Sequence, residues 1–319
     1  MTSYPEHFIY PEHFMPFPAV QPNLALGQCG DRIWAWVDQS GIAEDADVRR
    51  LLHRADPELT TARYFPTAAP DLFVYLSQLM AWIFVNDDEF DDGRLGRDPD
   101  RCAAAVAART GVLDALVPAG AMERSLADLW SRLPQGRSRG WHATFRKDLK
   151  SFLHSYVVEC NERQSGQWPG IDAYLAHRRD TAGTRWCADL MEVVVDADLP
   201  EDVRRRPAYQ ALKDAAAEHC GLINDIHSAG KETATGQIHN AACLIMHHRG
   251  LSLDDAIGVV NEMATDCVHA FNEAARDLPQ SDELDRWITG VQQLVRGNVD
   301  WHFESDRYRN DLSTMRGTS

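Results

Sequence analysis

Positive charge is scarce in this 319-residue sequence, which has 32 lysines and arginines against 48 aspartates and glutamates and a formal net charge of −16. A protein with a general affinity for nucleic acid needs a basic surface that neutralises phosphates. Nucleic acid is therefore not expected as a partner. A polyanionic ligand would need metal ions or a local group of arginines.

Long apolar stretches are missing as well. No uninterrupted run of about 18 apolar residues occurs, so no membrane span is expected. The first 20 residues lack the basic segment followed by an apolar segment that marks a secretion signal. These absences predict a cytoplasmic protein.

Cysteines with metal-ligand spacing are also lacking. The seven cysteines are scattered, odd in number and contain no C-x-x-C pair, which argues against a zinc site and a disulfide framework. Free cysteines are commonly buried. We expect burial for most of these.

Strand-like alternation and a βαβ rhythm are absent. From about residue 24 to residue 308, apolar residues recur at helical spacing, and no linker rich in proline, glycine or serine divides the region. A hydrophobic content of 44% with 25% charged residues is typical of a globular protein. The sequence predicts an all-α, single-domain protein with helices over residues 102–116, 121–131, 142–163, 171–195, 206–226, 237–248, 253–278 and 281–303.

The N-terminal 24 residues differ from the rest because they are rich in proline and aromatic residues. They contain a near-duplication, Tyr4-Pro5-Glu6-His7-Phe8 and Tyr10-Pro11-Glu12-His13-Phe14. Prolines at this density disfavour a helix. We expect an extended arm over residues 1–24, a helical domain over residues 25–309 and a C-terminal tail over residues 310–319.

An acidic row follows one of the most hydrophobic helices expected in the chain. An apolar stripe from Leu72 to Phe84 leads directly into Asp87-Asp88-Glu89-Phe90-Asp91-Asp92. Residues four apart share a helical face, so Asp87 and Asp91 would lie side by side. The segment could be an ordinary solvated helix end. It does not fit an EF-hand loop, because Asp92 stands where that loop needs glycine.

A second row of oxygen-bearing side chains is more specific. Asn224, Ser228 and Glu232 would place an amide, a hydroxyl and a carboxylate on one helical face. Hard oxygen ligands suit Mg²⁺ or Mn²⁺, and Mg²⁺ often takes one or two carboxylates because substrate phosphates and waters complete its octahedron. Lys231 adds a compact cation that can meet a phosphate oxygen. The two rows predict a magnesium-diphosphate site.

With these motifs the chain resembles the bacterial class I terpene synthases, over about residues 15 to 308. The D-D-x-x-D motif begins at Asp87, and the N-D-x-x-S-x-x-K-E motif begins at Asn224. The resemblance also rests on an arginine 46 residues before Asn224, a terminal Arg-Tyr pair and a tryptophan six residues before that pair, namely Arg178, Arg307-Tyr308 and Trp301. It implies the α-helical bundle of the class I terpenoid synthases.

The resemblance implies three Mg²⁺ ions, with Mn²⁺ as an alternative ion. Asp87 would bind two of them, and Asp91 would support these ions indirectly or serve as a further ligand. Asn224, Ser228 and Glu232 would chelate the third.

The resemblance also implies a prenyl diphosphate substrate. Charge-assisted hydrogen bonds to the diphosphate are strong ones, and the donors would be Arg178, Lys231, Arg307 and Tyr308. The family has a helix break near the upstream arginine. Thr181 and Ala182 occupy that place here, where aspartate and glycine are more familiar.

The implied reaction ionises an allylic carbon–oxygen bond and cyclises the carbocation. Metal ions and cationic donors neutralise the leaving diphosphate, and the protein supplies a dry, shaped pocket rather than a nucleophile. Aromatic faces stabilise cations by about 0.5 to 2 kcal/mol each. Phe84 and Trp301 are the candidates for this role, ahead of His154 and Tyr156, although an aromatic residue at helical spacing is often plain core.

The substrate chain length stays open. Farnesyl diphosphate is the commonest substrate of the bacterial enzymes that this chain resembles, which favours a sesquiterpene product. Cys220 and Ala217, one and two turns before Asn224, leave room for a geranylgeranyl chain and hence for a diterpene synthase. Family members are often homodimers, but no interface is readable in the sequence.

Two other classes of protein compete with this interpretation. A trans-prenyltransferase would carry a second D-D-x-x-D motif in place of the Asn224 row, and Asp254-Asp255 is followed by Ala-Ile-Gly instead. A non-catalytic, metal-binding helical protein would have no use for the predicted diphosphate donors.

Overall fold

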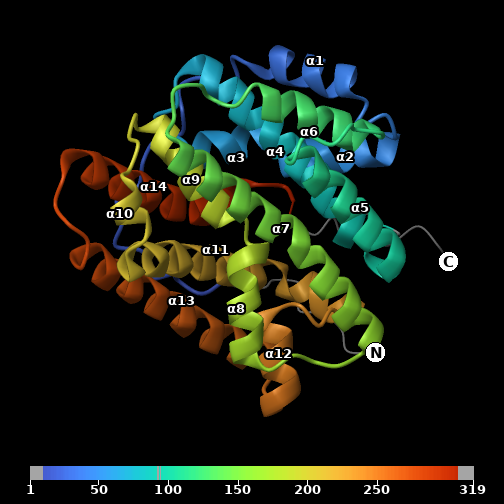
Figure 1. Ribbon diagram of the computed structural model, residues 1–319. Helices are drawn as coiled ribbons and strands as arrows, with labels where there is room; N and C mark the ends of the chain where they lie inside the picture. Colours follow the sequence, from blue (N-terminus) through green and yellow to red (C-terminus); the bar gives the residue numbers. More distant parts are fainter. Residues whose placement is uncertain (1–9, 92, 94, 308–319) are drawn as a thin grey trace.

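The computed structural model describes residues 10–91, 93 and 95–307. Within these ranges every regular element is helical, so the all-α prediction is confirmed (Figure 1). In chain order the elements are α1 (Gly30–Ser40), α2 (Ala46–Ala55), α3 (Pro57–Tyr64), α4 (Pro70–Asp91), η1 (Leu95–Arg97), α5 (Pro99–Val112), α6 (Ala121–Ser131), α7 (Arg139–Ser165), α8 (Ile171–Thr181), α9 (Thr184–Val194), α10 (Glu201–Arg204), α11 (Pro207–Thr235), α12 (Ala241–Arg249), α13 (Leu253–Arg276) and α14 (Asp282–Glu304).

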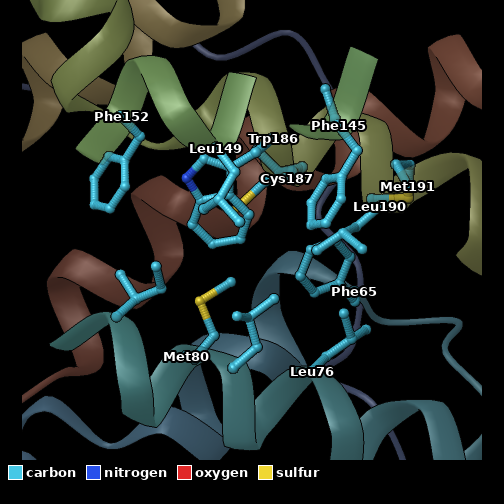
Figure 2. Packing of buried hydrophobic residues seen from close by; sticks show 14 of the residues in the cluster. Phe65, Leu76, Met80, Phe145, Leu149, Phe152, Trp186, Cys187, Leu190 and Met191 are labelled. Carbon is cyan, nitrogen blue, oxygen red and sulfur yellow. The ribbon is translucent and has the colours of Figure 1, made fainter. Parts of the chain in front are cut away.

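Helix α4 runs through the interior. Most of its 22 residues are buried, and a helix that is apolar on all sides is a core helix. Figure 2 shows Met80 of α4 facing Leu149 and Phe152 of α7 and Trp186 of α9. Helices that are far apart in sequence therefore share one core, and the C-terminal end of α4 is held firmly beside them.

A break separates α8 from α9. Helix α8 ends at Thr181 and α9 begins at Thr184, with Gly183 between them at φ 69°. Glycine adopts this left-handed conformation without steric cost, so the helix stops there. The single helix predicted over residues 171–195 is wrong. The break lies at the place where the family resemblance puts one.

Helix α11 has 29 residues and extends beyond residue 226, where the sequence pattern predicted its end. It begins with Pro207 in its first turn and ends before Gly236, which has φ 71° and caps it in the left-handed conformation. The row from Asn224 to Glu232 therefore lies on one continuous helix. The next helix begins at Ala241, four residues later than predicted.

Residues 10–23 form no helix and pack against the helical bundle. Tyr10 stacks on His227 of α11 with 4.2 Å between ring centroids. His13 Nδ1 lies 2.6 Å from Asn261 Oδ1 of α13. The described part of the predicted arm is thus tied to two helices.

All seven cysteines are buried free thiols, in agreement with the sequence prediction. In the described ranges, no helix combines the length and the hydropathy that crossing a membrane requires.

Candidate active site

A cavity of about 150 Å³ lies where α3, α4, α7, α8, α9, α11 and α14 meet. Its lining brings together five of the residues predicted to bind metal or diphosphate, namely Asp87, Asp91, Arg178, Asn224 and Arg307. Much of the remaining lining is apolar or aromatic and includes Met80, Ile83, Phe152, Trp186 and Cys187. Charged groups and an apolar surface therefore share one enclosed space.

The aspartate row lies in the last turns of α4, where it is paired with a cation. Arg307 Nη2 donates hydrogen bonds of 3.1 Å to both Asp87 Oδ2 and Asp88 Oδ1. The Tyr156 hydroxyl donates to Asp87 Oδ1 at 2.9 Å. Because the C-terminal end of a helix carries partial negative charge, carboxylates there need a positive partner. Arg307 is that partner in this structure.

The two aspartates of the row disfavour each other's charge. Burial raises the pKa of Asp91 well above its usual value, and the negative charges of Asp87 and Glu159 raise it further. Burial also raises the pKa of Asp87, although Arg307 opposes the shift. A bound cation would relieve this repulsion, so the electrostatics of the row fit a metal site.

Asn224 is held at both ends of its amide. Its Oδ1 accepts a hydrogen bond of 2.8 Å from Arg178 Nη2. His302 Nδ1 donates to the Asn298 carbonyl at 2.7 Å, so its Nε2 is the acceptor that faces Asn224 Nδ2 at 3.4 Å. Burial holds the pKa of His302 well below its usual value, which keeps this ring neutral and able to accept.

Ser228 and Glu232 share a different partner. Asn240 Nδ2 donates to Glu232 Oε2 at 2.8 Å and lies 3.3 Å from Ser228 Oγ. Burial raises the pKa of Glu232 to about 7, and the negative charge of Asp225 adds to this effect. This row too is a group of oxygen atoms that favours an added cation.

Arg178 connects α8 to α11. Its Nη1 donates to Thr181 Oγ1 at 2.9 Å, and its Nη2 lies 3.0 Å from Asp225 Oδ1. Burial alone would lower the pKa of Arg178, but the carboxylates of Asp225, Glu159 and Glu232 and the Tyr174 side chain together outweigh burial and raise it, so the guanidinium stays charged. Asp225 is itself fixed by a 2.6 Å hydrogen bond from the Tyr174 hydroxyl.

Glycine at position 221 allows the arginine to approach α11. Arg178 Nη2 donates to the Gly221 carbonyl at 3.2 Å. A Cβ atom at residue 221 would lie only 2.7 Å from Arg178 Cγ and 2.9 Å from Arg178 Nε. Any other residue would therefore push the arginine away from its partners.

Phe84 and Trp301 both line the cavity and stack on each other, with 5.9 Å between centroids and 21° between planes. The Arg307 guanidinium lies 5.0 Å from the centre of the Phe84 ring. Both rings are thus placed where an aromatic face could meet a cation. His154 is exposed on α7, so its placement in the pocket was wrong, and Tyr156 contributes its hydroxyl to Asp87.

Some predicted positions lie apart from the cavity. Lys231 is exposed on α11 and does not belong to the lining. Ala217 is buried without lining the cavity, whereas Cys220 lines it. Tyr308 lies outside the described residues.

The sequence analysis missed several residues that shape the site. Burial alone would raise the pKa of Glu159, but hydrogen bonding to His177 and the nearby His239 and Arg163 side chains lower it to about 2, so it adds negative charge near Asp91. Glu159 lies three residues after Tyr156 on the same face of α7, and this spacing is the signal in the sequence that could have identified it. Asn240 and His302 follow no motif, and only the packing of helices brings them to the second row.

A larger depression, of about 560 Å³, lies between the end of α9 and the start of α14. It contains none of the predicted residues. Its arginine, Arg286, is used to cap α9, because it donates to the carbonyls of Val195 at 3.2 Å and Asp196 at 3.1 Å. This depression lacks the converging charges of the first cavity.

The donor atoms of both rows are oxygens, the ligands that Mg²⁺ and Mn²⁺ prefer. Across the described ranges, no three His, Cys, Asp or Glu side chains come close enough to hold a metal ion by themselves. Ions at such a site would take further ligands from phosphate groups and water. The residues present therefore fit divalent ions that bind together with a phosphorylated ligand.

Comparisons with known proteins agree with this chemistry. A family model described as terpene synthase family 2, C-terminal metal binding, matches residues 78–270. The chain is 29% identical over 320 residues to the (2Z,6E)-hedycaryol synthase of Kitasatospora setae, covering 95% of this chain and 94% of that protein. It is 30% identical over 318 residues to a (−)-beta-caryophyllene synthase, (2E,6E)-farnesyl diphosphate cyclizing, of Saccharothrix espanaensis, covering 93% of this chain and 88% of that one.

Solved structures show the same likeness. Hedycaryol synthase in complex with HEPES has a TM-score of 0.81 at 26% identity, covering 93% of this chain and 99% of that chain. Hedycaryol synthase in complex with nerolidol has a TM-score of 0.80 at 25% identity, covering 92% and 100%.

Proposed function

The chain belongs to terpene synthase family 2, and from that membership we propose that it is a Mg²⁺-dependent class I enzyme that converts farnesyl diphosphate into a cyclic sesquiterpene. The observation that carries the proposal is the cavity itself. Asp87 and Asp91 of the first row, Asn224 of the second row and two arginines line a space whose remaining lining is largely apolar and aromatic, whereas Ser228 and Glu232 lie outside this lining. Such a site can neutralise a diphosphate at one part while it encloses a hydrocarbon chain at another.

Asp87 and Asp91 on α4, and Asn224, Ser228 and Glu232 on α11, would hold the metal ions. Bound Mg²⁺ supplies positive charge that stabilises the departing diphosphate. The protein positions these ligands before substrate arrives, because each of them except Asp91 already has a named hydrogen-bond partner.

The cationic side chains would receive the diphosphate. Arg178 is fixed on α8 by Thr181 and Asp225, and Arg307 lies three residues after the end of α14. Guanidinium groups present fixed N–H donors that match phosphate oxygens in pairs. Hydrogen bonds aimed at charge that develops as the carbon–oxygen bond breaks lower the barrier to ionisation. Lys231 and Tyr308 are further donors by the family resemblance.

The apolar lining would then shape the carbocation and exclude water. Phe152 and Trp186 are nearly fully buried, and they lie beside Met80 in the core (Figure 2). Phe84 and Trp301 would offer their faces to positive charge. The product would follow from the chain conformations that this lining permits.

The choice of farnesyl diphosphate has two supports. The caryophyllene synthase to which the chain is 30% identical cyclises farnesyl diphosphate. The cavity, at about 150 Å³, lies below the ~300 to 1,000 Å³ of ordinary small-molecule sites, so it would have to widen for either substrate and by less for the C15 chain. Geranylgeranyl diphosphate is the alternative substrate.

The test is incubation of the purified protein with Mg²⁺ and the C10, C15 and C20 prenyl diphosphates in parallel, followed by extraction and product identification. We expect a terpene hydrocarbon or alcohol from farnesyl diphosphate. Asp87→Ala and Asn224→Ala should abolish turnover and keep the helical circular-dichroism signal. Product from the C20 substrate alone would make the enzyme a diterpene synthase, and no product from any substrate would favour a non-catalytic metal-binding protein.

A further inference from the structure

Asn240 makes contacts that neither acidic motif predicts. It is fully buried and immediately precedes α12. Its Oδ1 accepts hydrogen bonds from the backbone nitrogens of Ala242 at 2.8 Å and Cys243 at 3.2 Å. This is a helix N-cap. Capping uses only the oxygen of the amide, so the nitrogen is available for a second task.

The amide nitrogen faces the second row. Nδ2 lies 2.8 Å from Glu232 Oε2, 2.8 Å from the Asp225 carbonyl oxygen and 3.3 Å from Ser228 Oγ. Its two N–H groups can serve the two nearer acceptors well and Ser228 more weakly. One buried amide therefore contacts two of the three proposed metal ligands on α11.

The orientation of this amide is determined by its surroundings. If oxygen and nitrogen were exchanged, the oxygen would face the Glu232 carboxylate and the N–H groups would face the backbone N–H groups of Ala242 and Cys243. Both contacts would be repulsive. The N-terminal end of α12 therefore fixes the amide oxygen of Asn240 and thereby directs its N–H groups at the second row.

We propose that Asn240 is a positioning residue for metal binding, which holds Ser228 and Glu232 so that their remaining oxygen lone pairs can meet the cation. The inference rests on the proposed function for the identity of these ligands. Glu232 lies three residues before the end of α11 and is only half-buried. A long carboxylate side chain loses rotamer freedom when it is ordered. Asn240 imposes that order when the protein folds rather than when the metal binds.

A near-isosteric substitution separates positioning from capping. Aspartate caps a helix about as well as asparagine does, so Asn240→Asp keeps the acceptor for α12 and replaces the donor by an oxygen that faces Glu232. Asn240→Ser keeps a capping oxygen and removes the donor without adding charge, in case the aspartate variant folds poorly. Ser252→Ala is the matched control, because Ser252 Oγ caps α13 by accepting from Asp255 N at 3.2 Å and belongs to another helix end.

The experiment measures the melting temperature of the full chain during titration with Mn²⁺ at a fixed concentration of inorganic diphosphate, which needs no turnover. Mutation of a residue that hydrogen-bonds to a metal ligand typically weakens metal binding by roughly 10- to 100-fold. We expect both Asn240 variants to need that much more Mn²⁺ for the half-maximal shift. Ser252→Ala should melt at a lower temperature without metal and keep the wild-type Mn²⁺ requirement.

The inference is overturned by Asn240 variants with the wild-type Mn²⁺ requirement, by a Ser252→Ala variant with an equal increase, or by a wild-type protein without any Mn²⁺-dependent shift. The readout is independent of the reaction. If the wild type shows the shift but converts no prenyl diphosphate, the proposed function fails and the role of Asn240 is still decided.

Discussion

Gly221 is the position at which the smallest change should affect the site most. A Cβ at this position would lie 2.7 Å from Arg178 Cγ, whereas nonbonded carbon atoms pack at about 3.5 to 4.0 Å. Gly221→Ala therefore requires Arg178 to move. Movement loosens its 2.8 Å hydrogen bond to Asn224 and its 3.0 Å ion pair with Asp225. Stability and activity should then respond by different amounts.

The effect on the free energy of unfolding is small because two contributions oppose each other. Alanine is better than glycine in a helix interior by about 1 kcal/mol, whereas overpacking costs about 1 to 3 kcal/mol. The net loss should be about 0 to 2 kcal/mol. Activity should fall further, because the loss of one donor to charge that develops in the transition state lowers kcat by roughly 10²- to 10³-fold.

The assay compares kcat/KM for farnesyl diphosphate and the unfolding midpoint in Gly221→Ala and Gly230→Ala. Gly230 lies on the same helix, and a Cβ there would meet nothing within 4 Å. Gly230→Ala should keep its activity and gain about 1 kcal/mol of stability. A folded Gly221→Ala enzyme whose kcat/KM stays within about threefold of the wild type would refute the role given to Arg178.

Phe84→Ala should alter the product distribution more than the stability, because this ring lines the cavity and stacks on Trp301 at 5.9 Å; an unchanged product profile by gas chromatography would make Phe84 plain core. Burial raises the pKa of Glu232 to about 7, and metal binding requires the ionised form. The half-saturating Mg²⁺ concentration should therefore fall about tenfold from pH 6 to pH 8. A half-saturating concentration that does not change with pH would contradict this. The same raised pKa means that the folded protein without metal holds a proton that the unfolded chain releases, so this contribution to stability is lost as pH rises through about 7. Inorganic diphosphate should strengthen Mg²⁺ binding, since an ion at Asp87 would release Arg307 to the phosphate; equal Mg²⁺ affinities with and without diphosphate in calorimetry would count against this exchange.

Spacing within one helix could be predicted from the sequence, because helix geometry alone puts Asn224, Ser228 and Glu232 on one face. Contacts between helices could not. Tyr156 reaches Asp87 across 69 residues, and Asn240 reaches back to the second row from the start of another helix. No periodicity connects such pairs, since they depend on how the helices pack.

Local geometry set a second limit on prediction. The left-handed φ of Gly183 divides a region whose apolar pattern continues on both sides. Lys231 was placed by its motif, yet its side chain is exposed rather than part of the cavity. A motif identifies a residue type at a position, whereas the direction of a long side chain depends on the neighbours that surround it.

The pairing of both rows with arginines explains how so acidic a site can exist in a folded protein. Arg307 Nη2 bridges Asp87 and Asp88, and Arg178 Nη2 bridges Asn224 and Asp225. Leaving a buried charge without its partner costs about 3 to 5 kcal/mol, so Asp225, which is 1% exposed, would strongly destabilise the fold without Arg178. The Arg307 pairs are partly exposed and contribute less.

In the proposed function the same two guanidinium groups receive the diphosphate, and one N–H donor cannot serve a carboxylate and a phosphate fully at once. A metal ion at Asp87 would take over the neutralising role of Arg307 and free that guanidinium for the phosphate, whereas Arg178 stays paired with Asp225, which is not a proposed metal ligand. The positive charge of the guanidinium then moves from a carboxylate partner to a phosphate partner, while the metal ion replaces it at the carboxylate. The residues that stabilise the folded site thus make the binding of metal ions and of diphosphate one coupled event.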